Sequence, residues 1–421
     1  MVFKLLLAFC FYLPFQIALN PSAEIDLASG RVFILLLLFS WLAESLKNKQ
    51  LIIKNSGINF FIVSFLCLNI FSVVVAKNTD WSLRKLLFLF SVFPLYFVFS
   101  ALINEAGKMQ KVITPLVFSG FIVSIMAISQ FVSQFIFGLN NVYKFWAEYI
   151  SPLFLGRNVT EAVLKNPSWL VNVSGNTYLR ATAMFPDPHM LAFFLGMLIP
   201  FSVGLYLKSK KSIYLVVFST MLLADLLTFS RGGYLGLFFG AIIVFLMFWK
   251  KLKKQYRLSV GVVFLLGSLI LLIPSPISGR FFSSFDFKEG SNQGRLETWK
   301  EAGEIILKNP IIGVGIGNYS LEIKATADYR EPIYAHSLYL DIAAETGLIG
   351  LFSWLGIILL LLINFIKKAQ KEILFFCAIV SVVIFSSHAL VETPLYSPIV
   401  LPLFLIIIAF NSVNLGDEKN T

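Results

Sequence analysis

Long apolar stretches alternate with short polar segments along most of this chain. Stretches approaching the roughly 20 residues that an α-helix needs to cross a bilayer can be placed at 3–19, 31–46, 58–76, 84–102, 112–137, 188–207, 212–228, 234–249, 258–273, 346–366, 373–390 and 397–411. Several of them are short and need flanking residues to complete the crossing. The pattern predicts an all-α polytopic membrane protein with about twelve transmembrane helices.

The composition agrees with a membrane location. Hydrophobic residues make up 57% of the 421 residues and charged residues only 14%, which excludes an ordinary soluble domain. The three cysteines, Cys10, Cys67 and Cys377, lie inside apolar stretches, where they are expected to pack as small hydrophobic side chains. The three histidines form no cluster with cysteines, so we expect no zinc site, no other metal and no cofactor.

The net charge of +11 follows from the expected topology. Alternate connections lie on the same side of the membrane, and one set of them is rich in lysine, most of all at 250–257. The short connections of the other set hold only Lys77 and Arg231. Because basic connections face the cytoplasm, both termini are expected there. The basic residues therefore give no argument for a nucleic-acid partner.

Two connections on the outer side are long. The expected organisation is transmembrane helices 1–5 in 1–137, an outer loop in 138–187, helices 6–9 in 188–273, a large outer loop in 274–345, helices 10–12 in 346–411 and a cytoplasmic tail in 412–421. No small-residue cleavage site is visible near Asn20, so we expect the first apolar stretch to stay as a helix rather than to be removed as a signal peptide.

The large outer loop contains a stretch with the period of a helix. Apolar or small residues fall on one face and charged residues on the other: Leu296, Trp299, Ala302, Gly303 and Ile306 against Glu297, Lys300, Glu301, Glu304 and Lys308. Arg295 and Trp299 are four residues apart and share a side, which puts the guanidinium beside the apolar face. We expect an amphipathic helix near the membrane surface, ended by Pro310.

Glycines alternate directly after this helix, at Gly313, Gly315 and Gly317. The spacing differs from the dinucleotide-binding G-x-G-x-x-G, and no βαβ unit surrounds it. Two interpretations remain. The favoured one is a turn that lets backbones pack closely, and the other is a backbone cradle for phosphate.

Charged residues also stand at the outer ends of predicted helices. Asp225 lies inside a helix, where a carboxylate is costly and usually has a partner, so we expect it to orient an arginine. Arg231, in the turn S-R-G-G-Y, is either a topological charge that snorkels or a functional cation. His388 and Glu392, four residues apart, either line a shared cavity or pair with each other.

The outer segments together offer a set of phosphate-binding and proton-accepting groups. Its members are Arg180, Arg231, Arg295 and His336, with carboxylates at Asp187, Asp225, Glu345 and Glu392. Arginine forks match phosphate oxygens and stay charged, which suits a diphosphate leaving group. Histidine can accept a proton from a hydroxyl group near neutral pH. No nucleotide-binding fold and no Ser-His-Asp hydrolase signature is visible.

Three motifs in this region resemble a known family. They are R-x-x-x-W, P-x-x-G-x-G-x-G and A-H-S-x-Y-L-x-x-x-x-E-x-G, and they span about 294–350. This combination resembles the shared region of the bacterial O-antigen ligase and polymerase superfamily. The motifs S-R-G-G-Y and R-A-T-A-M-F-x-D-P extend the likeness over most of the chain. His189 is a departure, since the family often has asparagine after this proline, and its role stays open.

The resemblance implies a GT-C-like glycosyltransferase of the bacterial inner membrane. It would move a glycan from undecaprenyl diphosphate to an acceptor hydroxyl, in lipid A-core or another cell-surface acceptor, on the periplasmic face, with inversion and without a metal. Arg231, Arg295 and Arg180 would hold the diphosphate, and His336 would activate or orient the acceptor. Asp225, Glu345, His388, Glu392 and Trp299 would support them. Membrane lipids complete the expected partners.

Other functions fit the same residues. An O-antigen or exopolysaccharide polymerase, or an enzyme that transfers the glycan to protein, would use the same donor with a different acceptor. The short cytoplasmic tail favours a plain ligase. A lipid-linked glycan flippase is an alternative without chemistry, but its charges are expected in the membrane interior rather than on the outer loops.

Overall fold

The computed structural model describes residues 1–22, 25–51, 56–165, 168–173, 175–249, 276–283, 290–329 and 332–415. The predicted helix 258–273 and the lysine-rich connection 250–257 lie outside these residues. In the described part the chain is mainly helical, and each of the other predicted stretches contains an α-helix. Two antiparallel two-stranded sheets, β1–β2 and β3–β4, complete the fold.

The elements before the first long outer loop are α1 (Val2–Tyr12), η1 (Leu13–Phe15), β1 (Ala18–Ser22), β2 (Ile25–Ala28), α2 (Ser29–Lys47), α3 (Gly57–Ser72), η2 (Val73–Val75), α4 (Thr79–Val92), α5 (Pro94–Leu102) and α6 (Ala106–Phe137). The outer loop holds α7 (Leu139–Phe145), the π-helical η3 (Trp146–Ile150), α8 (Ser151–Leu155), α9 (Arg157–Lys165), β3 (Leu170–Val173) and β4 (Asn176–Leu179). The later elements are α10 (Pro188–Ser209), α11 (Ile213–Leu226), α12 (Arg231–Trp249), α14 (Pro276–Ser283), α15 (Gly290–Lys308), α16 (Tyr319–Ile323), α17 (Leu338–Lys368), α18 (Ile373–His388), α19 (Val400–Ala409) and η4 (Phe410–Ser412).

Several of these helices can cross a membrane. Six segments in the described residues are long and apolar enough: Ser29–Lys47, Gly57–Val75, Thr79–Leu102, Ala106–Phe137, Pro188–Ser209 and Leu338–Lys368. The other apolar helices are shorter, among them α11, α12 and α18. The chain is therefore a multi-pass membrane protein, while the exact number of crossings stays a prediction.

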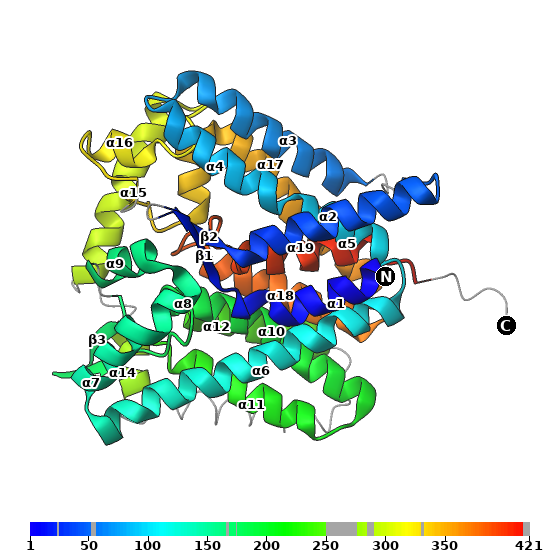
Figure 1. Ribbon diagram of the computed structural model, residues 1–421, viewed down its shortest axis with the longest axis horizontal. Coiled ribbons are helices and arrows are strands. Elements are labelled where there is room, and N and C mark those ends of the chain that lie inside the picture. The colour runs from blue at the N-terminus through cyan, green and yellow to red at the C-terminus, as the bar shows by residue number, and fades with distance from the viewer. Residues whose placement is uncertain are drawn as a thin grey trace.

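The polar connections gather at one end of the helix bundle. In Figure 1 the short helices α7, α8 and α9, the strand β3, and the helices α14, α15 and α16 lie at the left, whereas the chain begins at the right. The predicted amphipathic helix is present as α15, and it ends at Lys308, just before Pro310. Ala302 on its expected inner face is fully buried, and Glu297, Lys300 and Glu304 are exposed, as the periodicity predicts.

Glycines bring α12 into direct contact with α18. A Cβ atom at Gly232 would lie 2.3 Å from Cδ2 of His388, and one at Gly236 would lie 2.8 Å from the carbonyl oxygen of Ile384. A Cβ at Gly240, one turn further, would lie 2.7 Å from Cγ1 of the Ile384 side chain. Small residues at this spacing allow helix backbones to approach closely in a membrane. The turn S-R-G-G-Y is thereby held against the C-terminal end of α18.

The alternating glycines after α15 pack against three other segments. All three have positive φ, and a Cβ would lie 2.5 Å from the Ala344 carbonyl oxygen at Gly313 and 2.8 Å from Cα of Ala76 at Gly315. At Gly317 it would lie 3.0 Å from Cγ of Lys85. Positions of this kind favour glycine, since a side chain would be both strained and obstructed. The geometry supports the close-packing interpretation of the turn.

A substitution at Gly347 tests how much this packing contributes to stability. Gly347 interrupts α17 with φ 74° and ψ 178°, and a Cβ there would lie 2.0 Å from the Ile311 carbonyl oxygen. We expect Gly347→Ala to destabilise the protein by about 1–3 kcal/mol from backbone strain alone, with the clash adding to it. Gly303→Ala is the control, because it lies on α15 with no atom within 4 Å of the new Cβ. Equal thermal unfolding midpoints of the two variants in detergent would contradict this expectation.

Candidate functional site

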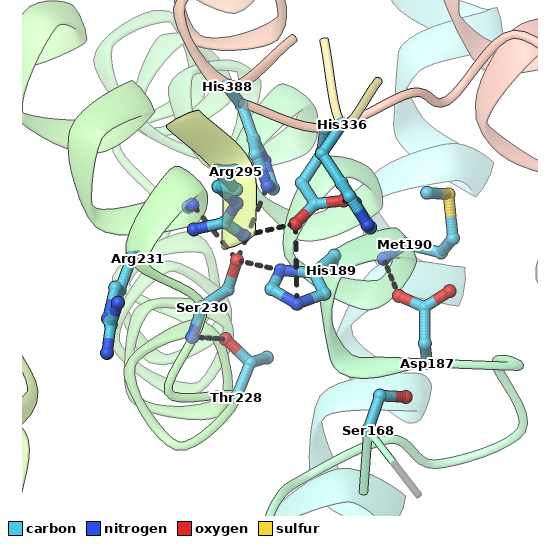
Figure 2. A network of polar contacts seen from close by, with 12 residues as sticks. Ser168, Asp187, His189, Met190, Thr228, Ser230, Arg231, Arg295, His336 and His388 are labelled. Carbon is cyan, nitrogen blue, oxygen red and sulfur yellow. Dashed lines mark hydrogen bonds and ion pairs between the residues drawn. The ribbon is translucent and has the colours of Figure 1, made fainter. Parts of the chain in front are cut away.

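Glu392 is the centre of a polar cluster at the end of the bundle where the polar connections gather. It lies in the connection after α18 and is 6% exposed. Its Oε1 accepts a hydrogen bond from Nη2 of Arg295 at 2.6 Å and lies 3.6 Å from Nε2 of His189, and its Oε2 lies 3.4 Å from Nδ1 of His336. Figure 2 shows these basic side chains converging from α10, α15 and the loop before α17. The cluster therefore joins groups that are far apart in the sequence.

The surroundings of Glu392 keep its carboxyl group ionised. Burial on its own raises the pKa of this carboxyl group. The neighbouring His189, the hydrogen bond from His336 and the charge on Arg295 outweigh burial and hold the pKa of that carboxyl group below its ordinary value. Glu392 can therefore serve as a permanent anionic acceptor at neutral pH.

His336 stands at the edge of this cluster. It lies just before α17 with a φ of 49°, a left-handed conformation that is uncommon for a residue with a side chain. The N–H of the preceding Ala335 donates to Oδ1 of Asp341 at 2.8 Å, which helps to hold the loop. The imidazole is 50% exposed, although its Nδ1 faces Glu392. The hydrogen bond to Glu392 raises the pKa of His336 above its ordinary value.

Ser230 connects His388, the third histidine, to His189 and so to the cluster. Its Oγ lies 2.9 Å from Nδ1 of His189 and 3.3 Å from Nε2 of His388, and it accepts a hydrogen bond from the N–H of Gly233 at 3.1 Å. The His388 ring stacks on Phe193 with centroids 3.6 Å apart. His388 and Glu392 thus belong to one site, linked through Ser230 and His189.

Two arginines stand at the border of a cavity beside this cluster. The cavity has a volume of about 340 Å³. It is lined by Arg231, Tyr234, Leu235, Phe238, Phe239, Phe281, Asn292, Arg295, Leu296, Trp299 and Val391. Nη1 of Arg231, the first residue of α12, donates to Oδ1 of Asn292 at 2.5 Å. Arg295 and Trp299 line the same cavity, as their helical spacing predicts. The walls are otherwise mostly aromatic and aliphatic.

The central part of the chain matches a family model. Residues 216–355 match the O-antigen ligase family, Wzy_C. The matched segment runs from α11 into α17 and contains Arg231, Arg295 and His336. The resemblance seen in the sequence motifs is therefore confirmed for this segment. No curated protein matches the chain.

Arg180 differs from Arg231 and Arg295 in its position relative to residues 216–355, the segment that matches the ligase family. It lies outside this segment, is 4% exposed, and donates from Nε to the Thr228 carbonyl oxygen at 2.8 Å, from Nη1 to that of Ser168 at 2.8 Å and from Nη2 to that of Phe229 at 3.2 Å. Burial, and after it the charge of Arg280, lower the pKa of Arg180 to about 9, so it remains a cation at neutral pH. Its contacts hold the turn before Ser230 rather than face the cavity.

Asp225 lies between α10 and α12. A Cβ at Gly196 would lie 3.5 Å from its Oδ2, and one at Gly233 would lie 3.3 Å from its Oδ1. Within the described residues neither carboxylate oxygen has a hydrogen-bond partner. Asp225 therefore does not orient Arg180 or Arg231 in this structure, contrary to the expectation from the sequence. The expectation failed because the helix turns this side chain toward the two glycines.

Glu345 supports the site from the side of the glycine turn. The Tyr396 hydroxyl group lies 3.4 Å from Oε2 of its carboxylate, and in the turn the N–H of Gly313 donates to the Asn309 carbonyl oxygen at 3.1 Å. The N–H of Gly315 in turn donates to the Glu345 carbonyl oxygen at 2.9 Å. These contacts use the turn's N–H groups on the protein itself, which argues against the phosphate-cradle interpretation.

Sequence reasoning missed Ser230 and Asn292 and left His189 open. Ser230 stood inside the motif S-R-G-G-Y, and His189 was noted as a departure after Asp187-Pro188, so both had a signal in the chain. The Asp187 side chain caps α10 by accepting from the N–H of Met190 at 2.9 Å, which fixes where the helix begins and hence where His189 points. Burial raises the pKa of Asp187 to about 6.

Proposed function

We propose that the protein is an O-antigen ligase-like glycosyltransferase that moves a glycan from undecaprenyl diphosphate to an acceptor hydroxyl group. The observation that carries this proposal is that one carboxylate, Glu392, holds both Arg295 at the cavity and His336 beside it. A cation for the leaving group and a base for the acceptor are thereby placed in one polar cluster. The match of residues 216–355 to the O-antigen ligase family supports the same reaction class.

The cavity suits the donor. Arg231 and Arg295 supply two cations with fork geometry, and Asn292 adds an amide between the walls. The aromatic and aliphatic walls, including Phe238 and Phe239, offer an apolar surface for the first isoprene units of the carrier. In the proposed complex the diphosphate contacts the arginines, while Arg180 keeps the loop in place.

The reaction is a single displacement. The acceptor oxygen attacks the anomeric carbon, its proton passes to Nε2 of His336, and the bond from the anomeric carbon to the diphosphate oxygen breaks with inversion. The arginines stabilise the charge that develops on the leaving diphosphate. The imidazolium then returns its proton to the diphosphate or to water, which restores the neutral base.

The same arrangement supports a location for the reaction. The site lies at the end of the bundle where the polar connections gather, as Figure 1 shows for α14, α15 and α16. We propose that this end faces the periplasm, that the membrane is the bacterial inner membrane and that both termini are cytoplasmic. Lipid A-core is the proposed acceptor, and a growing glycan or a protein is the acceptor of the related alternatives.

Conservative arginine variants test the diphosphate contact. We expect Arg231→Lys and Arg295→Lys each to lower kcat/KM for transfer by about tenfold to a hundredfold, because lysine keeps the charge but loses the planar fork. The measurement is an in vitro assay with purified protein, undecaprenyl-diphosphate-linked glycan and lipid A-core. Arg157→Lys on the exposed face of α9 is the matched control and should transfer at the parental rate.

The same assay separates the alternatives. Full transfer by both cavity variants would contradict the diphosphate contact. Donor that moves across the bilayer but is never consumed would indicate a flippase instead. Product that appears on a longer glycan or on a protein would identify a polymerase or a protein-directed transferase.

A further inference from the structure

All three histidines of the chain are connected through Ser230 and Glu392. We propose that His388, Ser230 and His189 form a directional hydrogen-bond array that holds Glu392 in place for His336, which makes His189 a positioning residue. The array extends from the buried end of α18 through α10 to the exposed base. The inference rests on the proposed function only in that His336 is taken as the base of transfer.

The direction of each hydrogen bond follows from the carboxylate end. Nε2 of His189 lies 3.6 Å from Oε1 of Glu392, which is an electrostatic contact, and because a lone pair on this nitrogen would repel the carboxylate, we assign it the hydrogen atom. In a neutral ring Nδ1 of His189 is then an acceptor, and Ser230 must donate to it. The Ser230 hydroxyl hydrogen is thereby used, so Nε2 of His388 must be the donor at the other end.

The far end of the array agrees with this direction. If His388 donates from Nε2, its Nδ1 carries a lone pair and needs no acceptor. Within the described residues this buried Nδ1 has no hydrogen-bond partner. A lone pair without a donor is less costly there than a buried N–H without an acceptor. The N–H of Gly233 also donates to Ser230, so in this arrangement the hydroxyl group donates to His189 and accepts from Gly233 and His388, which uses its full hydrogen-bonding capacity.

The packing holds these rings in place. His388 is fully buried and stacks on Phe193 at an interplanar angle of 6°, and the glycine at position 232 leaves room for its ring. His189 is placed in the first turn of α10 by the Asp187 cap and Pro188, and its side chain is 15% exposed. Figure 2 shows Ser230 between the two imidazoles. These contacts leave the two imidazole rings little room to rotate, so the direction of the hydrogen bonds is kept.

The array has a consequence for the base. Glu392 accepts a hydrogen bond from Arg295 at 2.6 Å, faces Nε2 of His189 at 3.6 Å and accepts from Nδ1 of His336 at 3.4 Å, which leaves Nε2 of His336 with the lone pair for the acceptor. Removing the His189 donor concentrates the negative charge of Glu392 on His336 and stabilises its protonated form. The acidic limb of the pH–rate profile would then move to higher pH.

Other ionisable groups act on the same pair and remain in these variants. The groups with an electrostatic influence on Glu392 or His336 are Arg180, Asp187, His189, Arg295, Asp341 and His388. None of them except His189 changes in the test. A movement of the limb therefore reports the loss of the His189 donor.

The first test needs no substrate. With three histidines in the chain, protein labelled with ¹⁵N at histidine and reconstituted in nanodiscs gives three imidazole signal sets. We expect His189 and His388 with the hydrogen atom on Nε2 and His336, when neutral, with it on Nδ1. In Ser230→Ala the His189 signals should change, whereas the control Ser202→Ala, which removes a bond within α10 only, should leave them unchanged. A His189 ring with hydrogen on Nδ1, or on both nitrogens, would overturn the array.

The second test uses the transfer reaction. We expect His189→Phe to move the acidic limb of kcat to higher pH. If His336 binds its proton tenfold more tightly, about tenfold less of it is neutral at pH values below the limb. The rate there then falls in proportion. His189→Gln, whose amide can still donate to Glu392, should restore the parental profile. An unchanged limb in a folded His189→Phe protein would reject the positioning role. If the parental protein transfers no glycan, the proposed function fails, while the nanodisc spectra still decide whether the array exists.

Discussion

Replacing His336 by alanine should stop glycan transfer while leaving the donor bound. If His336 is the base, its loss removes about 10²- to 10⁴-fold from the chemical step. The proposed donor contacts come from Arg231 and Arg295, separate side chains on α12 and α15, so affinity for the undecaprenyl-linked glycan should change little. Single-turnover transfer and donor binding, measured on the same preparation, check the two halves of this expectation.

A second variant at His336 separates base chemistry from loop geometry. Asparagine tolerates the φ of 49° and can still donate to Glu392, but it cannot accept a proton in the reaction. We therefore expect His336→Asn to fold normally and to be as inactive as the alanine variant. Substantial transfer by His336→Asn would remove the base role. Loss of donor binding in both variants would assign His336 to the donor site instead.

Neutralising Glu392 should have the second large effect, because three basic groups lose their shared partner. Arg295 and Glu392 are both mostly buried, and removing one partner of such a pair costs about 3–5 kcal/mol. We expect Glu392→Gln to lower both the stability and the rate of transfer. The pH–rate profile distinguishes this role from a general loss of activity, because its acidic limb should shift.

The direction in which the acidic limb shifts follows from the pKa of His336. The hydrogen bond to Glu392 raises this pKa. In the proposed mechanism the active base is the neutral ring, so the bond moves the acidic limb of the profile to higher pH in the parental protein. In Glu392→Gln the limb should move to lower pH, even as the maximal rate falls. Glu372→Gln is the control, since it breaks the Lys208 ion pair of 2.8 Å between α10 and the start of α18. A limb that stays in place or rises in Glu392→Gln would contradict the role of Glu392.

The sequence predicted those parts of the site that are formed by residues close together in the chain. Helical periodicity placed Arg295 and Trp299 on one side of α15, and the structure puts both at one cavity. The alternating glycines predicted close packing, and their positive φ values fit it. In these cases the relevant neighbours lie within a few residues, so a period or a spacing carries the information.

The parts of the site that depend on contacts between residues far apart in the chain could not be predicted in this way. Glu392 was only a supporting candidate, because its partners His189 and Arg295 come from other helices, and no periodicity relates them. Arg180 was expected at the diphosphate, but three backbone carbonyl groups surround its guanidinium. The sequence shows that the loop carries such a charge, but only the packed loop shows which acceptors it contacts.

In the proposed mechanism, the sharing of one carboxylate between Arg295 and His336 would couple donor affinity to the protonation of His336. A diphosphate that draws Arg295 away from Oε1 leaves more of the Glu392 charge to His336, and so favours the protonated ring. Thermodynamic linkage is reciprocal, so protonation of His336 must strengthen donor binding by the same factor. Donor would then be held most tightly while the base is still occupied by a proton, and the site becomes competent for attack only when that proton leaves. Donor binding and acceptor attack would thus be controlled by which partner, Arg295 or His336, interacts with Glu392.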